Sequence, residues 1–397
     1  MQKLSIKNII LIAALAFGLG LLSPHISSWL TETPLLKAPV EIKEDHEPIV
    51  SDDFTLRLLK AATVVQPTGN IILAPDSLAT TLLQMLPLAA PEVEKALQEL
   101  KLSEKPLASS AYLADCSLLF ADSAAALNQE HAVRYVFETP FSEKLPETYR
   151  NINLSLQNQL GEEVGTPANG ETVNNKTNLL AVNGINISIN WSIPVSKELT
   201  TADIFHNANG GTPQVRFMNV YSQHYAEDPM GNWKAAAIRL DRHPRVTPET
   251  PDCFLILLQP TRSSNAHNMA AALTGEQFSA IRTALRESSR TCSTKLPRLK
   301  FSDGVQDNTP LLKALGIDPL FTSATPFSKL TEQAPWPFTT AWQFCRVVMK
   351  ESVQAAVDSK PVPQTSEVFD CNRPFIWFLM PISSPLPPYA MGVVENL

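Results

Sequence analysis

Residue types that could perform chemistry are present in this chain, but they form no recognisable catalytic pattern. The sequence has no GxSxG, HExxH, GxGxxG or P-loop motif. Its seven histidines are scattered without a second ligand at metal-binding spacing: His25, His46, His131, His206, His224, His243 and His267. Histidines outside such motifs are usually solvated or hydrogen bonded. We therefore expect no enzyme activity, no catalytic residue, no metal site and no cofactor.

The cysteines also lack the spacing of a metal or redox site. There are five of them, none in a CxxC pair: Cys116, Cys253, Cys292, Cys345 and Cys371. An odd number leaves at least one thiol unpaired. We expect mostly buried, small hydrophobic side chains, and one disulfide remains open.

A stretch near the C-terminus, "KESVQAAVDSKPVPQTSEVFDCNRPF" (350–375), begins like a strand and then departs from that pattern. Small or apolar residues alternate with polar ones, as a strand with one face buried requires: Val353, Ala355, Val357 and Ser359 against Gln354, Asp358 and Lys360. Pro361 and Pro363 follow, and a central strand excludes proline because a ladder hydrogen bond is lost. Chance alternation in an ordinary loop or edge strand is the alternative.

Composition indicates the class of protein, and the N-terminal segment indicates its location. Hydrophobic residues make up 44% and charged residues 18%, typical of a packed globular protein, and a net charge of -7 argues against nucleic acid as a partner. Lys3 and Lys7 precede an apolar run at 9–22, which predicts a signal peptide or signal anchor over 1–30. Residues 31–50 are Pro-rich and charged and are typical of a linker. We expect the body outside the cytoplasm, where it is secreted, periplasmic or anchored to the membrane.

The remaining residues, 51–397, predict one α+β domain. Helices are expected over 51–63 and in "DSLATTLLQMLPLA", which Asp76 or Ser77 would cap. Later segments are rich in apolar residues, as strands are: "NLLAVNGINISINW", "KAAAIRLD", "DCFLILLQP", "FCRVVMK" and "PFIWFLMP". Segregated helices and strands indicate large, mainly antiparallel sheets.

Several of these segments resemble family motifs, in the right order over nearly all of 51–397. They are "NIILAPDSLATTLLQML", "LLAVNGINISINWSIPV", "ADIFH", "LPRLKF…LLKALGI", "FSKLTEQAP" and "NRPFIWFLMP…AMGVVENL". The spacing from Asn183 to Trp191 also fits the family's central strand, which ends in a buried tryptophan. The chain is identified on these motifs as a divergent, bacterial-type member of the serpin family.

This resemblance implies a fold and a mechanism. The fold would be the α+β serpin fold, with three mainly antiparallel sheets, about nine helices and an exposed reactive loop near the C-terminus. In the family a serine protease cleaves that loop, and the N-terminal half of the loop inserts into the main sheet as a new strand. The insertion releases strain from a metastable fold and distorts the acylated protease.

The resemblance also assigns residues to the loop. The hinge would be Lys350, Glu351, Ser352, Val353, Gln354, Ala355 and Ala356. Here Ser352 replaces the usual glycine, and Val353 the usual threonine. The scissile bond would lie in Pro363, Gln364, Thr365, Ser366 and Glu367, with Thr365 or Ser366 favoured before it. Those small side chains suggest an elastase-like protease with a small pocket.

A polar latch under the central strands is the last element that the resemblance implies. Family members often use two serines, an asparagine and a histidine, and the matching positions are Ala74, Ser77, Asn183 and Trp342. Half of the latch would then be missing, with Trp342 filling space by packing. Two functions remain open: a serine protease inhibitor that traps its target, and a non-inhibitory binding protein, carrier or protease substrate.

Overall fold

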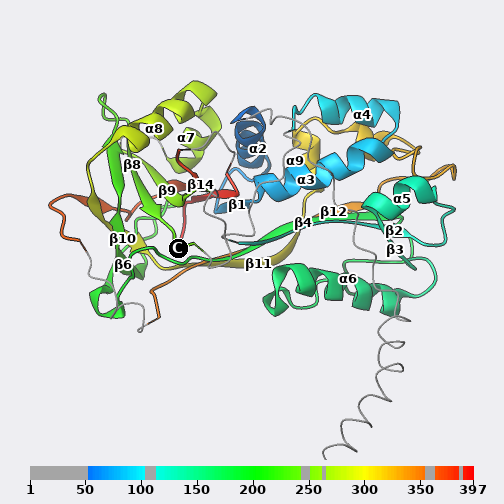
Figure 1. Cartoon of the computed structure of the whole chain (residues 1–397), viewed down its shortest axis with the longest axis horizontal. Coiled ribbons are helices and arrows are strands. Elements are labelled where there is room, and N and C mark those ends of the chain that lie inside the picture. The colour runs from blue at the N-terminus through cyan, green and yellow to red at the C-terminus, as the bar shows by residue number, and fades with distance from the viewer. Residues whose placement is uncertain (1–51, 103–112, 243–250, 262–264, 354–362, 384–387) are drawn as a thin grey trace, which may run out of the picture.

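Three β-sheets with helices packed on them organise the chain in the computed structural model (Figure 1). The structure describes residues 52–102, 113–242, 251–261, 265–353, 363–383 and 388–397. The expected signal or anchor segment and the linker lie outside these residues. Within them, the expected α+β class with three mainly antiparallel sheets and about nine helices is confirmed.

Nine α-helices lie in the described part of the chain, and five of them precede strand β4 (Leu179–Ser188). They are α2 (Asp52–Val65), α3 (Pro75–Met85), α4 (Pro91–Gln98), α5 (Gln129–Tyr135), α6 (Leu145–Leu160), α7 (Ala266–Ala272), α8 (Gly275–Glu287), α9 (Thr309–Ala314) and α10 (Pro319–Thr322). The start of α3 differs from the expectation. Ala74 is its N-cap, Pro75 is its first residue, and no side chain caps it. Proline suits this position because it lacks the N–H that would be unpaired there, so Ser77 is left for another role.

The largest sheet has six strands and the smallest has four. The six are β1 (Ile71–Leu73), β15 (Ala390–Val394), β14 (Phe375–Pro381), β9 (Cys253–Pro260), β8 (Trp233–Arg239) and β7 (His224–Glu227), in spatial order. The four are β13 (Val368–Asp370), β10 (Cys292–Pro297), β6 (Gln214–Ser222) and β5 (Thr201–Ile204). β14 and β9 are buried at every position, which accounts for their unbroken apolar runs.

The five-stranded sheet has two parallel strands at its centre. Its order is β11 (Leu299–Asp307), β12 (Thr340–Met349), β4 (Leu179–Ser188), β2 (Ala114–Asp122) and β3 (Phe137–Thr139). The central strands β12 and β4 are parallel and paired without interruption from Thr340 opposite Leu180 to Val348 opposite Ser188. Their outer neighbours, β11 and β2, are antiparallel to them. β12 and β4 are therefore direct neighbours, with no strand between them, and we call the sheet closed in this sense.

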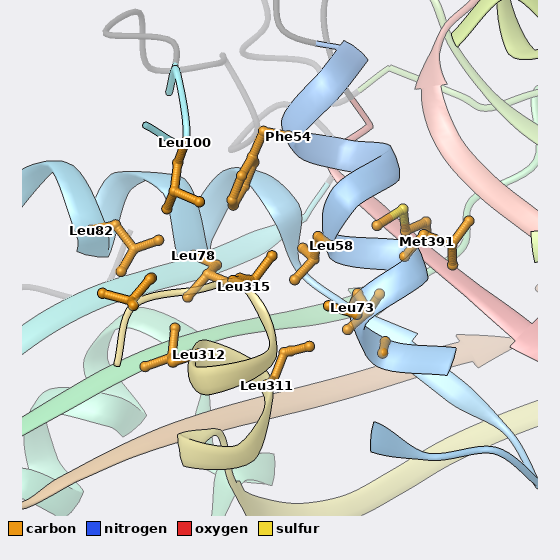
Figure 2. Close-up of a cluster of buried hydrophobic side chains, with 14 of the residues drawn as sticks. Phe54, Leu58, Leu73, Leu78, Leu82, Leu100, Leu311, Leu312, Leu315 and Met391 are labelled. Carbon is orange, nitrogen blue, oxygen red and sulfur yellow. The ribbon is translucent and has the colours of Figure 1, made fainter. Parts of the chain in front are cut away.

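Helices cover both faces of this sheet. Figure 1 shows α6 on one side and α2, α3, α4 and α9 on the other. Leucines of α2, α3 and α9 meet between the helices in a buried cluster (Figure 2), formed among others by Leu58, Leu78, Leu82, Leu311 and Leu312. Each fully buried side chain of this size contributes about 1.5–3 kcal/mol relative to an exposed one. This cluster fixes α3, whose first turn contacts the centre of the sheet.

Candidate functional site

The chain leaves β12 through a short hinge that is held by hydrogen bonds from a neighbouring segment. The indole Nε1 of Trp191 donates to the carbonyl of Lys350 at 2.7 Å. Ser352 is bound twice to Val195: its N–H donates to the Val195 carbonyl at 3.0 Å, and its Oγ accepts from the Val195 N–H at 2.9 Å. A glycine at Ser352 would lack the second bond. The substitution that the sequence shows at the hinge is thus an added tether.

Glu351 forms the charged part of the hinge. Its side chain is only 3% exposed and forms an ion pair with Arg298, which precedes β11. Arg298 Nε donates to Glu351 Oε1 at 2.7 Å, and the Thr200 hydroxyl donates to the same oxygen at 2.6 Å. Burial acts to raise the pKa of the Glu351 carboxyl, but the hydrogen bonds from Arg298 and Thr200 outweigh it and leave the pKa below its ordinary value. The hinge is therefore held by an ionised, charge-assisted contact.

Acid should loosen this contact. A carboxyl whose folded-state pKa is depressed stabilises the fold above its ordinary value of 4.5, and the contribution is lost as the pH falls through the folded pKa. We expect the melting temperature of the uncleaved protein to fall on acidification from about pH 6 to about pH 4, and to fall less in Glu351→Gln. Thermal unfolding followed by circular dichroism measures this. Exposed Glu143 provides the matched control, Glu143→Gln, which should behave as wild type. Equal pH dependence in all three proteins would contradict the assignment.

Val353 is the last hinge residue that the structure describes, and it is exposed. Val353 is 79% exposed, an unusual state for a large apolar side chain. The inward-facing residues of β12, such as Val347 and Met349, share its sequence parity and are fully buried. Val353 would continue their row if the strand were extended. The remaining predicted hinge residues, Gln354, Ala355 and Ala356, lie outside the described residues.

The chain is described again from Pro363, where the predicted scissile segment lies at the entrance to β13. Pro363, Gln364 and Ser366 are exposed, whereas Thr365 and Glu367 are partly buried. The Glu367 carboxylate is bound by Arg290, and its carbonyl accepts from the Ser293 N–H at 2.8 Å. Sequence reasoning did not connect Arg290 with the loop, because the two are distant in the chain and no spacing rule links them.

Under the centre of the five-stranded sheet, Ser77 links α3 to two strands. Its Oγ donates to the carbonyl of Cys116 in β2 and accepts from the N–H of Gly184 in β4 at 2.9 Å. Cys116 and Gly184 are register partners. A side chain at Gly184 would not fit, because its Cβ would lie 2.7 Å from the Phe344 carbonyl oxygen. The backbones of β4 and β12 therefore lie close together here. The buried hydroxyl of Ser77 links α3 to β2 and β4 beside them.

The second half of the latch differs from the sequence expectation. Asn183 donates to Gln343 Oε1 at 3.5 Å and accepts from the amide of Asn308 at 3.1 Å, and Gln343 donates to the Ile72 carbonyl at 3.1 Å. Trp342, the residue matched to the family histidine, lies on the opposite face, where it packs in the cluster that contains residues of α6. Adjacent strand residues point to opposite faces. Gln343 is thus the residue that faces Asn183, and the expectation that Trp342 fills this space was wrong.

Within the described ranges, no group of three or more His, Cys, Asp or Glu side chains could hold a metal ion. All five cysteines are free and buried, as expected, and burial raises the thiol pKa of Cys116, Cys253 and Cys371 well above its ordinary value. His224 and His267 are hydrogen bonded to backbone carbonyls. No helix in the described part of the chain is both long and apolar enough to cross a membrane.

Comparison with known proteins agrees with this geometry. Solved structures of similar fold include maspin (TM-score 0.72, 19% identity, 87% of this chain and 97% of that chain). Serpin-12 of Manduca sexta (0.71, 18%, 87% and 98%) and uncleaved ovalbumin (0.71, 16%, 88% and 99%) are also similar. Human Serpin B4 is 24% identical over 252 residues, and the match spans 62% of each protein's length.

A family model extends the match through most of the domain. The model described as Serpin (serine protease inhibitor) matches residues 103–396, which include both central strands, the hinge and the closing strand pair. The bacterial origin suggested by the sequence stays a prediction. The chain belongs to the serpin family.

Proposed function

We propose that the protein inhibits a serine protease by offering residues 357–369 as bait and inserting the N-terminal half of the cleaved loop into its five-stranded sheet. The observation that carries this proposal is the central pair β12–β4, which is parallel in the uncleaved state. A strand that enters between two parallel strands can be antiparallel to both of them. One parallel contact is then replaced by two antiparallel ones, which are slightly more stable per residue.

The loop sequence suits such a strand. The hinge follows β12 directly, so a chain that reverses there would run antiparallel to β12, beside it. Val353 is already exposed at the start of the alternating segment. Burying an apolar residue of this size contributes about 1.5–3 kcal/mol. Insertion would bury Val353, Ala355 and Val357 on the apolar face and leave Gln354, Asp358 and Lys360 on the other.

A second candidate function is that of a non-inhibitory serpin, which binds a partner or is merely cut by proteases. The hinge contacts favour it. Three contacts would have to break before the loop could enter the sheet. They are the hydrogen bond from Trp191 to Lys350, the ion pair of Glu351 with Arg298, and the paired bonds of Ser352 with Val195. An inhibitor must complete insertion before the acyl-enzyme hydrolyses. A tethered hinge and two loop prolines would slow that step.

Incubation with purified serine proteases distinguishes the two functions. The panel should include enzymes whose pockets accept basic, aromatic, small aliphatic and glutamine side chains. Trapping gives a band at the summed mass that resists boiling in denaturing electrophoresis. Cleavage without such a band, by every protease that cuts the loop, would reject inhibition and leave the non-inhibitory function. Neither of the two proposed functions requires the protein to act as an enzyme.

The location of the protein belongs to the same proposal. The Lys-flanked apolar run at 9–22 supports export, with the domain of residues 51–397 outside the cytoplasm and the first 30 residues removed or serving as a membrane anchor. Cell fractionation with N-terminal sequencing tests this. Full-length protein found only in the cytosol would refute export, whereas an intact N-terminus in the membrane fraction would indicate the anchor.

A further inference from the structure

The C-terminal end of the loop is closed by a turn that the sequence did not suggest. The Thr365 Oγ1 accepts from the N–H of Glu367 at 3.2 Å and donates to the carbonyl of Glu367 at 2.9 Å. The chain bends at Ser366 between them. Threonine hydroxyls stabilise such turns by bonding to backbone groups two residues along. Residues 365–367, called here the anchor turn, are therefore compact rather than extended.

Glu367 ties this anchor turn to the body of the protein. Arg290 Nε donates to Glu367 Oε1 at 2.9 Å, and Nη2 donates to Oε2 at 2.5 Å, so the carboxylate is held at both oxygens. The same guanidinium lies over the ring of Tyr225, 4.7 Å from its centroid. The two-pronged geometry fixes direction as well as distance. Val368 and Phe369 then continue into β13, parallel to β10, and Phe369 is buried.

A protease needs a different conformation of its substrate. It binds the residues around the scissile bond as an extended strand, using their backbone N–H and C=O groups, and the side chain before the bond enters a specificity pocket. Cleavage after Thr365 would require the Thr365 hydroxyl to leave both of its bonds to Glu367. Cleavage after Ser366 would require the Glu367 amide, its carbonyl and its carboxylate to be withdrawn from Thr365, Ser293 and Arg290.

The bond after Gln364 requires neither the Thr365 hydroxyl nor Glu367 to be at the cleavage position. The Gln364 side chain is exposed, and it lies just outside the anchor turn. Of the anchor turn, only Thr365 borders the bond after Gln364, and the contacts of Glu367 with Ser293 and Arg290 lie farther along the chain. Pro363 before Gln364 favours the extended conformation, since its φ is restricted to a value common in polyproline and β structure. The preceding bond, between residues 362 and 363, places proline on the leaving side, where its missing N–H and rigid ring oppose cleavage.

We propose that the anchor turn shields the bonds after Thr365 and Ser366, and that the first loop bond cut is the one between Gln364 and Thr365. This inference rests on the proposed function only in that a serine protease recognises the loop. It specifies that protease further: its pocket accepts an uncharged amide side chain, and it tolerates proline at the preceding residue.

Mass spectrometry of the C-terminal fragment after brief digestion with the same protease panel tests the proposal. The expected fragment of the wild type begins at Thr365. In Arg290→Gln, which alters no residue near the bond, we expect cuts after Thr365 or Ser366 to increase about tenfold relative to the cut after Gln364, because Glu367 loses a two-pronged charged contact. Arg286→Gln is the matched control, since Arg286 pairs with Glu287 on the surface of α8 and has no ion pair with the described residues of the loop.

The outcomes separate this inference from the function itself. A wild-type fragment that begins at Ser366, at Glu367 or at any residue before Thr365 overturns the inference, whether or not a complex forms. An unchanged cleavage pattern in Arg290→Gln overturns the shielding role of the anchor turn. Cleavage after Gln364 without a boiling-resistant complex supports the inference and rejects inhibition. The absence of any cut in the loop overturns both.

Discussion

Cutting the loop within residues 357–369 is expected to raise the melting temperature of the protein by about 10 °C, and replacing Pro361 and Pro363 should enlarge that rise. The reason is that the freed segment can join the five-stranded sheet between β12 and β4. Val353 to Lys360 have the alternation for it, but each proline beyond them lacks the N–H that a ladder bond requires. Each missing bond costs about 1 kcal/mol net, and more if the opposite carbonyl remains unpaired.

Differential scanning calorimetry of intact and cut protein measures this effect. The variant Pro361→Ala/Pro363→Thr is compared in both states, and the intact variant serves as the control for any effect of the substitutions on the uncut fold. A wild-type rise of several tens of degrees would show that the prolines are no obstacle, given that each kcal/mol shifts the melting temperature by only a few degrees. No rise in either protein would mean that the alternation is accidental, and the non-inhibitory function would then be favoured.

Ser77→Ala is expected to destabilise the uncleaved fold by about 2–5 kcal/mol, as a lower unfolding midpoint in urea. The Ser77 hydroxyl serves two buried backbone groups, the Cys116 carbonyl and the Gly184 N–H, and so joins α3 to both strands. Alanine leaves both groups without this partner and shielded from water by the surrounding core. An unpaired buried polar group costs about 1–3 kcal/mol.

Ser117→Ala is the matched control for this prediction. It is the same substitution on a neighbouring strand residue, and it removes a hydrogen bond of 2.8 Å from Ser117 Oγ to the Ser77 carbonyl. That carbonyl keeps a second partner in the Thr81 hydroxyl, at 3.0 Å, so only about 0.5–1.5 kcal/mol should be lost. Equal losses in the two variants would show that Ser77 does not serve as the link between the strands.

Contacts that keep the five-stranded sheet closed compete with insertion of the loop into it. The latch at Ser77, Asn183 and Gln343 and the contacts of the hinge hold the sheet closed, whereas the exposed Val353 and the segment after it would gain by entering it. In an inhibitor, the loop segment must enter the sheet quickly once the loop is cut. The added bond of Ser352 and the buried ion pair of Glu351 would both delay insertion, so the proposed inhibitory and non-inhibitory functions differ in what they require of the hinge.

Much of the fold could be predicted from the sequence, because its determinants are local and ordered along the chain. Unbroken apolar runs predicted the buried strands β9 and β14, and the family motifs predicted the three sheets. The sequence by itself also determined that Pro361 and Pro363 would each leave a strand without one backbone hydrogen bond, since proline lacks an N–H in any fold.

Only the tertiary structure decided which side chains meet at the centre of the sheet and at the ends of the loop. Trp342 and Gln343 are adjacent, and a shift of one residue in register exchanges the face that each occupies, so a motif comparison could not tell which one lies opposite Asn183. Likewise, nothing in the local sequence indicates that Arg290 binds Glu367 or that Arg298 binds Glu351. Those pairs arise because strands distant in the chain end side by side, and that proximity is a property of the sheets rather than of any segment.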